Sequence, residues 1–334
     1  MDAPTGCQLN RDLAGAMDRE PQRGPRTLRV RPSAFELSRT QLRTVFAAAL
    51  VFGCSIVAWG APEAPPPRPR AEVEAVLAQT PPSEAVRALR PLRIVLVADA
   101  KDHGPDEHDY PYFQRTWAEL LSGGAGEASA PGGTPAGVAV SRAWQWPDAG
   151  QWASADVVVA ICYLDWSKPR VQELGAFLAR GGGFVVVHAA TWTRPEPSPQ
   201  LAELIGVGGF TRWREGPLEL ELNPEHPICR GLPTKIRLVD EVYWPPTPVP
   251  APGAIEVLAV SWEVDNGGPA VARPLVWTHR RGQGRVFGCV PGHYNWTFDD
   301  PLYRLLLLRG IAWSAGESPY RFDLLALERA RVAP

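Results

Sequence analysis

The sequence lacks several features that would place it in a familiar functional class. Its 34 Lys and Arg residues do not exceed its 36 Asp and Glu residues, so it has no basic excess of the kind that nucleic-acid-binding proteins carry. It contains no G-x-x-x-x-G-K-[ST] loop, no G-x-S-x-G elbow and no G-x-G-x-x-G segment that opens a helix. We therefore expect no nucleic-acid partner, and no motif indicates a nucleotide-binding or serine-hydrolase site.

Cysteine is scarce, and its spacing does not indicate metal binding. The five residues are Cys7, Cys54, Cys162, Cys229 and Cys289, with no C-x-x-C pair among them. The last three form an odd number without paired spacing, which argues against a disulfide framework and against a zinc site made of four cysteines. Three buried thiols are favoured over one disulfide with a spare thiol, because Cys162 and Cys289 lie in apolar runs.

Long apolar runs are also absent, with one exception near the N-terminus. Residues 45–60 carry no charge and follow Arg39 and Arg43, but this run is shorter than the roughly 20 apolar residues that a spanning helix needs. A basic stretch, a short apolar core and small residues at its end are typical of a secretory signal peptide. We predict export to the periplasm or the extracellular space. An uncleaved membrane anchor over 45–60 and a lipoprotein signal ending at Cys54 are the alternatives.

The segments on either side of this run have no regular period. Residues 1–44 are rich in Arg and are predicted to be a disordered basic region, whose true start could lie at Met17 or later. Residues 61–90 begin with APEAPPPRPRAE, which is typical of a Pro-rich extended linker. The folded domain is predicted over 91–318, followed by a C-terminal tail over 319–334.

Short apolar segments alternate with helical ones in the first part of this domain. We predict strands over 92–98, 137–140, 155–162 and 183–188, with helices over 112–121 and 169–180. The second part adds strands over 216–222, 256–260, 274–278 and 284–290, and a closing helix over 301–315. This pattern predicts an α/β fold, a three-layer αβα sandwich built on a mainly parallel sheet. Ligands bind such sheets outside the carboxyl ends of the strands.

Polar residues that suit chemistry follow several of the predicted strands. The segment 101–110 combines two histidines with four carboxylates, His188 ends a strand, and His293 follows the last strand of the sheet. Glu241 lies in a further acidic segment, 239–244. Imidazoles and a carboxylate can hold a Zn²⁺-like ion with an open position. The predicted metal ligands are His103, His108 and His293, and the predicted proton-transferring residues are His188, Glu241 and Asp109. The alternatives are that the segment 101–110 is a solvated polar loop and that His188 is a partly buried histidine with a structural role.

Tryptophan is abundant, with 13 residues in the chain. Rings placed in loops can stack on the faces of sugars, whereas packing in the core or at its rim is the alternative. Tyr110, Trp192 and Trp296 are the predicted substrate-binding residues.

Several motifs, taken in order, resemble the ThuA-like (trehalose utilisation) family. The strongest are KDHGPDEHDYPYFQ at 101–114, GGGFVVVHAATW at 181–192 and PGHYNWTFDDPLYRLLLLRGIAW at 291–313. The resemblance implies a flavodoxin-like fold of the class I glutamine amidotransferase-like superfamily and a role in sugar catabolism linked to keto-disaccharides. In that superfamily a nucleophilic Cys follows the strand aligned here with 183–187, where this sequence has His188. Release of ammonia from glutamine is therefore not expected.

Together these features predict an exported enzyme that processes a small carbohydrate by metal-assisted or acid–base hydrolysis or isomerisation. The main alternative is a non-catalytic module that binds a glycan or a partner through its Trp-rich rim. A weaker alternative is an amidase that uses Cys162. The oligomeric state is left open.

Overall fold

The computed structural model of the protein describes residues 62–81, 89–123 and 137–334. The chain divides into two compact units, Met1–Gly60 and Ala61–Pro334. The predicted basic region over 1–44 and the signal peptide or anchor over 45–60 lie outside the described residues. Within the described part of the chain, no helix is both long enough and apolar enough to cross a membrane.

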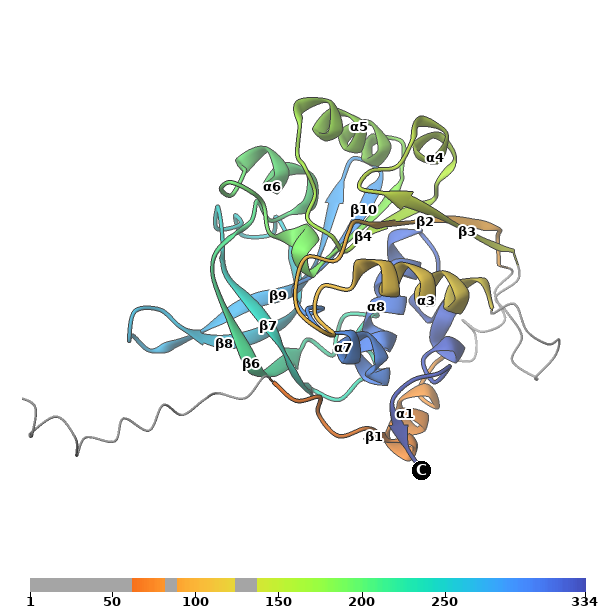
Figure 1. Ribbon diagram of the computed structural model, residues 1–334, viewed down its shortest axis with the longest axis vertical. Helices are drawn as coiled ribbons and strands as arrows, with labels where there is room; N and C mark the ends of the chain where they lie inside the picture. Colours follow the sequence, from red (N-terminus) through yellow and green to blue (C-terminus); the bar gives the residue numbers. More distant parts are fainter. Residues whose placement is uncertain (1–61, 82–88, 124–136) are drawn as a thin grey trace, which may run out of the picture. The chain divides into compact units, whose positions relative to one another are not determined.

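A nine-stranded sheet forms the centre of the second unit, in the order β3-β2-β4-β5-β10-β9-β8-β6-β7 (Figure 1). The first five strands in this order are parallel to one another: β3 (Val138–Trp144), β2 (Leu92–Ala98), β4 (Val157–Ala160), β5 (Gly183–Val187) and β10 (Gly284–Cys289). The remaining neighbours are antiparallel and add the longer strands β9 (Ala270–Arg281), β8 (Glu256–Val264), β6 (Phe210–Leu222) and β7 (Lys235–Pro246).

The prediction of a mainly parallel three-layer αβα sandwich was wrong. The sheet is mixed, and its antiparallel ladders pair more residues than its parallel ones. The cause lies after residue 209, where the chain returns through hairpins instead of crossing over through helices. The Arg281↔Gly284 pair closes one such hairpin between β9 and β10, as its turn sequence predicted. β9 extends beyond its predicted range of 274–278 at both ends, whereas β10 ends one residue before its predicted end at 290.

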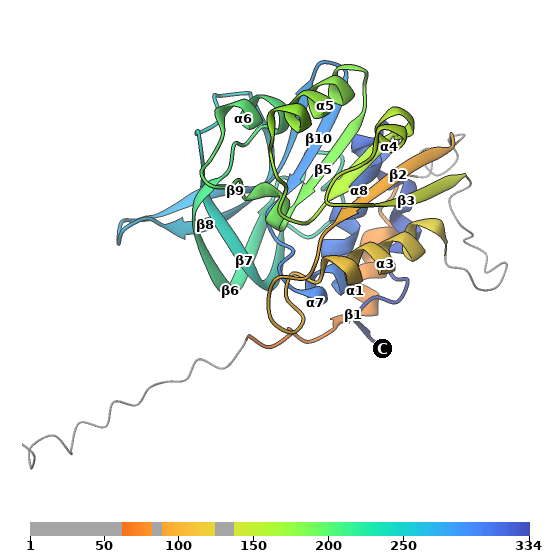
Figure 2. The same cartoon turned by 45° about the horizontal axis from the view of Figure 1, so that its top comes forward.

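Helices cover both faces of the parallel half (Figure 2). α3 (Tyr110–Ser122) and α8 (Pro301–Ser314) lie on one face, and α4 (Ala149–Ser154), α5 (Lys168–Ala179) and α6 (Pro199–Ile205) lie on the other. α8 is buried along its whole length and approaches the sheet closely. A Cβ added at Gly183 would lie only 2.3 Å from the Ser314 carbonyl oxygen, so this approach requires glycine at the start of β5.

The segments that flank the domain pack together. β1 (Arg68–Pro69) pairs with β11 (Val332–Ala333), and α1 (Arg70–Leu77) buries Val73 and Val76. Part of the range predicted as extended linker is therefore helical, because valines three residues apart give it an apolar face. The tail adds the 3-10 helix η3 (Pro319–Leu325), whose Asp323 accepts a hydrogen bond from Thr80 at 2.7 Å.

Candidate metal centre

Three histidines meet at the carboxyl edge of the parallel strands. His188 follows β5 and opens the 3-10 helix η2 (His188–Thr191). His293 lies after β10, just before α7 (Asn295–Asp299), and His108 lies in the loop after β2. The His108 N–H donates to the His293 carbonyl oxygen at 2.9 Å, which joins the two loops. Glu241 reaches the same place from β7, and ligand atoms of all four residues lie within 4.8 Å of one another.

The His188 Nε2 atom is the centre of this cluster. It lies 2.8 Å from His108 Nε2, 3.3 Å from His293 Nδ1 and 3.3 Å from Glu241 Oε2. The Glu241 carboxylate also lies 3.1 Å from His293 Nδ1. All three imidazoles are buried, and Glu241 is exposed by only 7%. Four potential metal ligands therefore surround one point that bulk water scarcely reaches.

Hydrogen bonds at the far sides of two rings determine where their protons lie. His188 Nδ1 is 2.9 Å from the Val290 carbonyl oxygen, which can only accept, so Nδ1 carries the proton in the neutral ring. His108 Nδ1 likewise lies 2.8 Å from the Asp102 carboxylate. The two Nε2 atoms that face each other are thus both left with lone pairs. Such an arrangement favours an electrophile, a proton or a cation, between them.

Both of these histidines have a backbone conformation that is rare for residues with side chains. His108 has a φ of 42° and His188 a φ of 51°. Left-handed conformations cost of order 1–3 kcal/mol and cluster at functional sites, where the surrounding structure holds them in place. The backbone of Gly292, next to His293, has a φ of 138°, and a Cβ there would lie 3.1 Å from the His188 Cβ. The fold therefore accepts local strain in order to bring the rings together.

Strand β7 supplies the acidic and phenolic groups of the site. Burial raises the pKa of Glu241, but the neighbouring His188 and His293 rings outweigh burial and lower this pKa to about 2. For His293, burial lowers the pKa, and the hydrogen bond with Glu241 and the nearby carboxylates raise it more. Burial and the charge of Glu241 raise the pKa of Tyr243, whose hydroxyl donates to Glu241 Oε2 at 2.9 Å. Tyr243 therefore stays protonated, and Glu241 stays ionised.

A buried carboxylate beside the site holds the loop that carries His293. Asp240 Oδ1 accepts the backbone N–H of Gly292 at 2.9 Å and that of His293 at 3.1 Å. Asp240 Oδ2 accepts the hydroxyl of Thr297 in α7. Because Asp240 directly precedes Glu241, one dipeptide of β7 both positions the loop and contributes to the cluster.

The other predicted site residues lie at the rim or have different partners. His103 is exposed, and its Nδ1 lies 2.8 Å from the same Asp102 oxygen that His108 contacts. The Tyr110 hydroxyl is 2.8 Å from His108 Nδ1. Asp109 Oδ1 accepts the Tyr112 N–H and caps α3, and no Asp109 atom joins the cluster.

The two predicted substrate-binding tryptophans are both close to residues of the site. The Trp192 ring meets Tyr243 edge to face, with ring centroids 4.8 Å apart. Trp296 stacks on Tyr294 at 4.0 Å and donates its indole N–H to the Val239 carbonyl oxygen. Both rings are only partly exposed, so neither offers a fully open face on which a sugar could stack.

Sequence reasoning did not select Tyr243 and Asp102. Tyr243 lies two residues after Glu241 in one strand, and this period places both side chains on the same face. Asp102 belongs to the acidic segment 101–110, and only the fold distinguishes it from its acidic neighbours, by placing it against His108. A third omission is Glu215 of β6, whose Oε1 lies 4.0 Å from His293 Nε2. That nitrogen is buried and has no hydrogen-bond partner among the described residues.

The three cysteines in the described part of the chain do not form a second reactive site. Cys162, Cys229 and Cys289 are free and buried, which confirms the prediction of three buried thiols. Burial, with the charge of Asp99, raises the pKa of Cys162 to about 12. A thiol with so high a pKa holds very little of the nucleophilic thiolate, so its setting does not favour an amidase built on Cys162.

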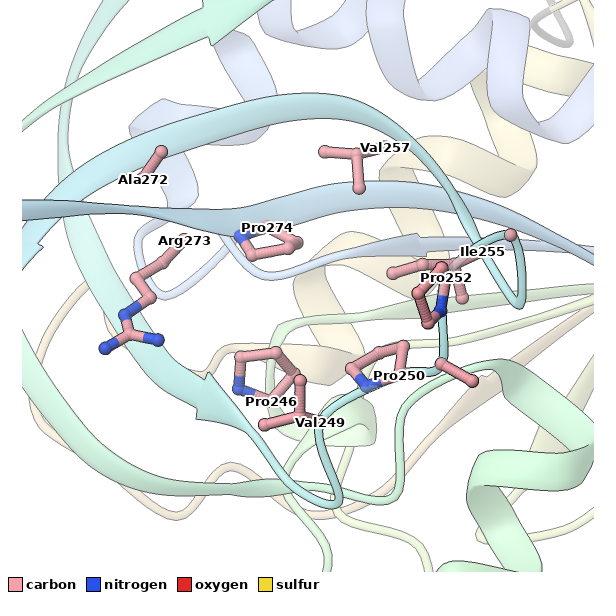
Figure 3. Close-up of a pocket in the computed structure, with 11 residues that line it drawn as sticks. Pro246, Val249, Pro250, Pro252, Ile255, Val257, Ala272, Arg273 and Pro274 are labelled. Atoms are coloured by element: carbon pink, nitrogen blue, oxygen red, sulfur yellow. The ribbon is translucent and has the colours of Figure 1, made fainter.

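A pocket of about 310 Å³ lies away from the histidines, between the loop after β7 and strands β8 and β9 (Figure 3). Its lining is rich in proline and includes Pro246, Pro250, Pro252 and Pro274. Its charged residue, Arg273, pairs with Asp265. None of the predicted catalytic or metal-binding residues lines this pocket, so it does not contain the chemical centre.

Comparison with solved structures finds similar folds at low sequence identity. A protein from Bacteroides uniformis ATCC 8492 described as ThuA-like is 19% identical, with a TM-score of 0.52 over 70% of this chain and 97% of that one. Another from Parabacteroides merdae ATCC 43184 is 22% identical, with a TM-score of 0.49 over 69% of this chain and 92% of that one. A search of curated proteins finds no match.

The family assignment comes from the sequence. Residues 136–314 match the family model described as ThuA, trehalose utilisation. This range includes His188, Glu241 and His293, whereas His108 precedes it. The matched range covers more than half of the sequence, and the chain belongs to the ThuA (trehalose utilisation) family.

Proposed function

We propose that this protein is a metal-dependent enzyme that processes a carbohydrate. One observation carries the proposal: His108 Nε2 and His188 Nε2 lie 2.8 Å apart in a buried cluster with Glu241 and His293, and the contacts of the two Nδ1 atoms leave a lone pair on each Nε2. Two lone pairs at this distance repel each other unless a positive centre lies between them. The ThuA family description, trehalose utilisation, supports a sugar as the substrate.

The donor set fits a Zn²⁺-like cation. Zn²⁺ binds imidazole nitrogen and carboxylate oxygen at about 2.0–2.2 Å, which in a tetrahedron puts neighbouring ligand atoms about 3.3 Å apart. The separations around His188 Nε2 run from 2.8 to 3.3 Å. Metal-binding histidines are commonly oriented by a hydrogen bond at the other ring nitrogen. His108 Nδ1 has such a partner in Asp102, and His188 Nδ1 has one in the Val290 carbonyl oxygen. His108, His188, His293 and Glu241 would hold the ion.

The remaining residues have roles that follow from their contacts. A bound cation would supply Lewis-acid polarisation of a sugar keto group or of water. The Tyr243 hydroxyl, 2.9 Å from Glu241 Oε2 and 3.0 Å from His188 Nε2, would hold or donate a proton at the reacting oxygen. Asp102 and Tyr110 would keep His108 in the tautomer that leaves Nε2 free. The reaction class is hydrolysis or isomerisation, with a keto-disaccharide as the first substrate to assay.

Removal of the cation is the direct test. A ligand held at about 1,000 times its Kd stabilises the folded state by about 4 kcal/mol. In a unit of this size that corresponds to a Tm shift of roughly 8–16 °C. We expect the protein, purified without a histidine tag, to contain near-stoichiometric transition metal by elemental analysis, and to lose this Tm increment in EDTA and regain it with Zn²⁺. EDTA already saturated with Zn²⁺ is the control. Metal-free protein whose Tm does not respond to added cations would refute the proposed centre.

We also propose that the protein acts outside the cytoplasm. The support is the uncharged run over 45–60 behind two arginines, which lies outside the described residues. Cell fractionation of the full chain should place it in the periplasmic or secreted fraction, or in the membrane fraction if the run is an uncleaved anchor. A chain that lacks residues 45–60 should remain in the cytosol. A cytosolic location of both chains would contradict export.

A further inference from the structure

An exposed tryptophan lies beside the candidate metal centre, and its contacts give it no evident structural role. Trp213 of β6 is 58% exposed. None of the residues in 62–81, 89–123 and 137–334 accepts a hydrogen bond from its indole N–H, whereas those of Trp244 and Trp277 bind Asp265 and the Ile205 carbonyl. Covering a large exposed ring with a ligand removes apolar surface from water, which is favourable for binding.

The strand register places this ring on the side of the sheet that faces the site. Trp213 is opposite Tyr243 in the β6–β7 ladder, and Glu215 is opposite Glu241. Directly opposite residues in an antiparallel pair point to the same side, with Cβ atoms about 5 Å apart. Tyr243 and Glu241 both contact His188, so Trp213 and Glu215 extend the same surface outward from the cluster.

Glu215 connects the two parts of this surface. Its carboxylate lies 4.0 Å from His293 Nε2 and accepts the Tyr294 hydroxyl at 3.4 Å. Trp213 follows the same face two residues along the strand, about 7 Å away, which is close to the length of one sugar ring. A ligand that reaches the cluster past Glu215 would place its next unit over Trp213.

We propose that Trp213 is the platform of a second sugar-binding subsite, which stacks on the pyranose unit next to the one at the metal centre. A pyranose suits this position because its apolar C–H face can lie on the indole while its hydroxyl groups remain in water or reach Glu215. The enzyme would accordingly prefer disaccharides or longer glycans over monosaccharides. This inference rests on the proposed function, since it takes the ligand to be a carbohydrate.

The test compares short and long sugars on matched variants. Binding of gluco-, galacto- and xylo-oligosaccharides of one to four units is measured by titration calorimetry with the full, metal-loaded protein. We expect Trp213→Ala to weaken binding of disaccharides and longer sugars about tenfold or more while leaving monosaccharide binding unchanged. Trp213→Phe, which keeps a ring, should retain most of the affinity. Trp144→Ala is the control, because Trp144 is 55% exposed on β3, at the opposite edge of the sheet.

The possible outcomes separate this subsite from the metal-dependent function. Sugar binding that is unaffected by Trp213→Ala, or equally weakened for monosaccharides and tetrasaccharides, overturns the subsite and leaves the metal centre intact. The same holds if wild type binds tetrasaccharides no more tightly than monosaccharides. Wild-type protein that holds the cation but binds no sugar in the panel overturns both the subsite and the carbohydrate substrate. Selective loss of the longer sugars supports the subsite.

Discussion

Replacement of His293 by alanine is expected to abolish stoichiometric cation binding and, with it, turnover. His293 Nδ1 lies 3.3 Å from His188 Nε2 and 3.1 Å from the Glu241 carboxylate, so its loss removes one of four ligands from the centre. Loss of an outer hydrogen-bond partner typically costs 10–100-fold in metal affinity, and loss of a ligand should cost more, of the order of a thousandfold. Elemental analysis and competition with a chromophoric chelator measure the effect.

Two controls make this result specific. The alanine variant retains the backbone N–H that Asp240 accepts, so the loop over 291–294 should keep its position, and circular dichroism should remain that of wild type. His279→Ala removes a histidine that contacts the Ala254 carbonyl outside the cluster, and it should leave metal content unchanged. Asp109→Ala should likewise retain the cation and lose about 1 kcal/mol of stability through its helix cap. Full metal occupancy in His293→Ala would contradict the assigned ligand set.

The largest stability effect is expected for Arg309→Leu. Arg309 is completely buried in α8, where it forms a two-pronged pair with Asp323 at 3.0 and 2.8 Å. It also donates to the carbonyl oxygens of Ile228 and Arg230. Removal of one partner leaves a buried carboxylate without its countercharge, which costs about 3–5 kcal/mol. Thermal denaturation should show a Tm lower by roughly 6–20 °C.

A double variant distinguishes charge burial from general disruption. Arg309→Leu combined with Asp323→Leu removes both charges, so it should be more stable than Arg309→Leu alone. Arg329→Ala is the exposed control: its pair with Glu119 lies at the surface, where such pairs contribute at most about 1 kcal/mol. If the free energy of unfolding of Arg309→Leu lies within about 1 kcal/mol of that of wild type, the Arg309–Asp323 pair does not attach η3 to the rest of the domain.

The sequence was most informative where local pattern and topology agree. β2 begins and ends at the predicted residues, and the rule that ligands gather at carboxyl ends correctly brought His108, His188 and His293 to one edge. It was less informative where structure depends on pairing between distant segments, although Glu241 itself was among the predicted site residues. The position of Glu241 next to His188 requires β7 to pair with β6 in one register, and no local period fixes that register.

Asp109 illustrates a different difficulty. It lies in the acidic loop beside the histidines, which favoured a role in proton transfer, yet it also directly precedes a helix with proline in its first turn. An aspartate in that place is a common helix cap. Both interpretations fit the same residues, and only the contact with the Tyr112 N–H distinguishes them.

The division of the sheet into two halves has a consequence for engineering. The parallel half carries the three histidines of the cluster, whereas β6 belongs to the antiparallel half and approaches them through Glu215, 4.0 Å from His293 Nε2, and not through the exposed Thr211 and Trp213. Mutant libraries confined to positions 211 and 213 would therefore alter the surface next to the cluster without changing its four proposed metal ligands or the buried Asp240. Under the proposed function, substitutions at these two positions would change which sugars bind while the four proposed metal ligands stay the same.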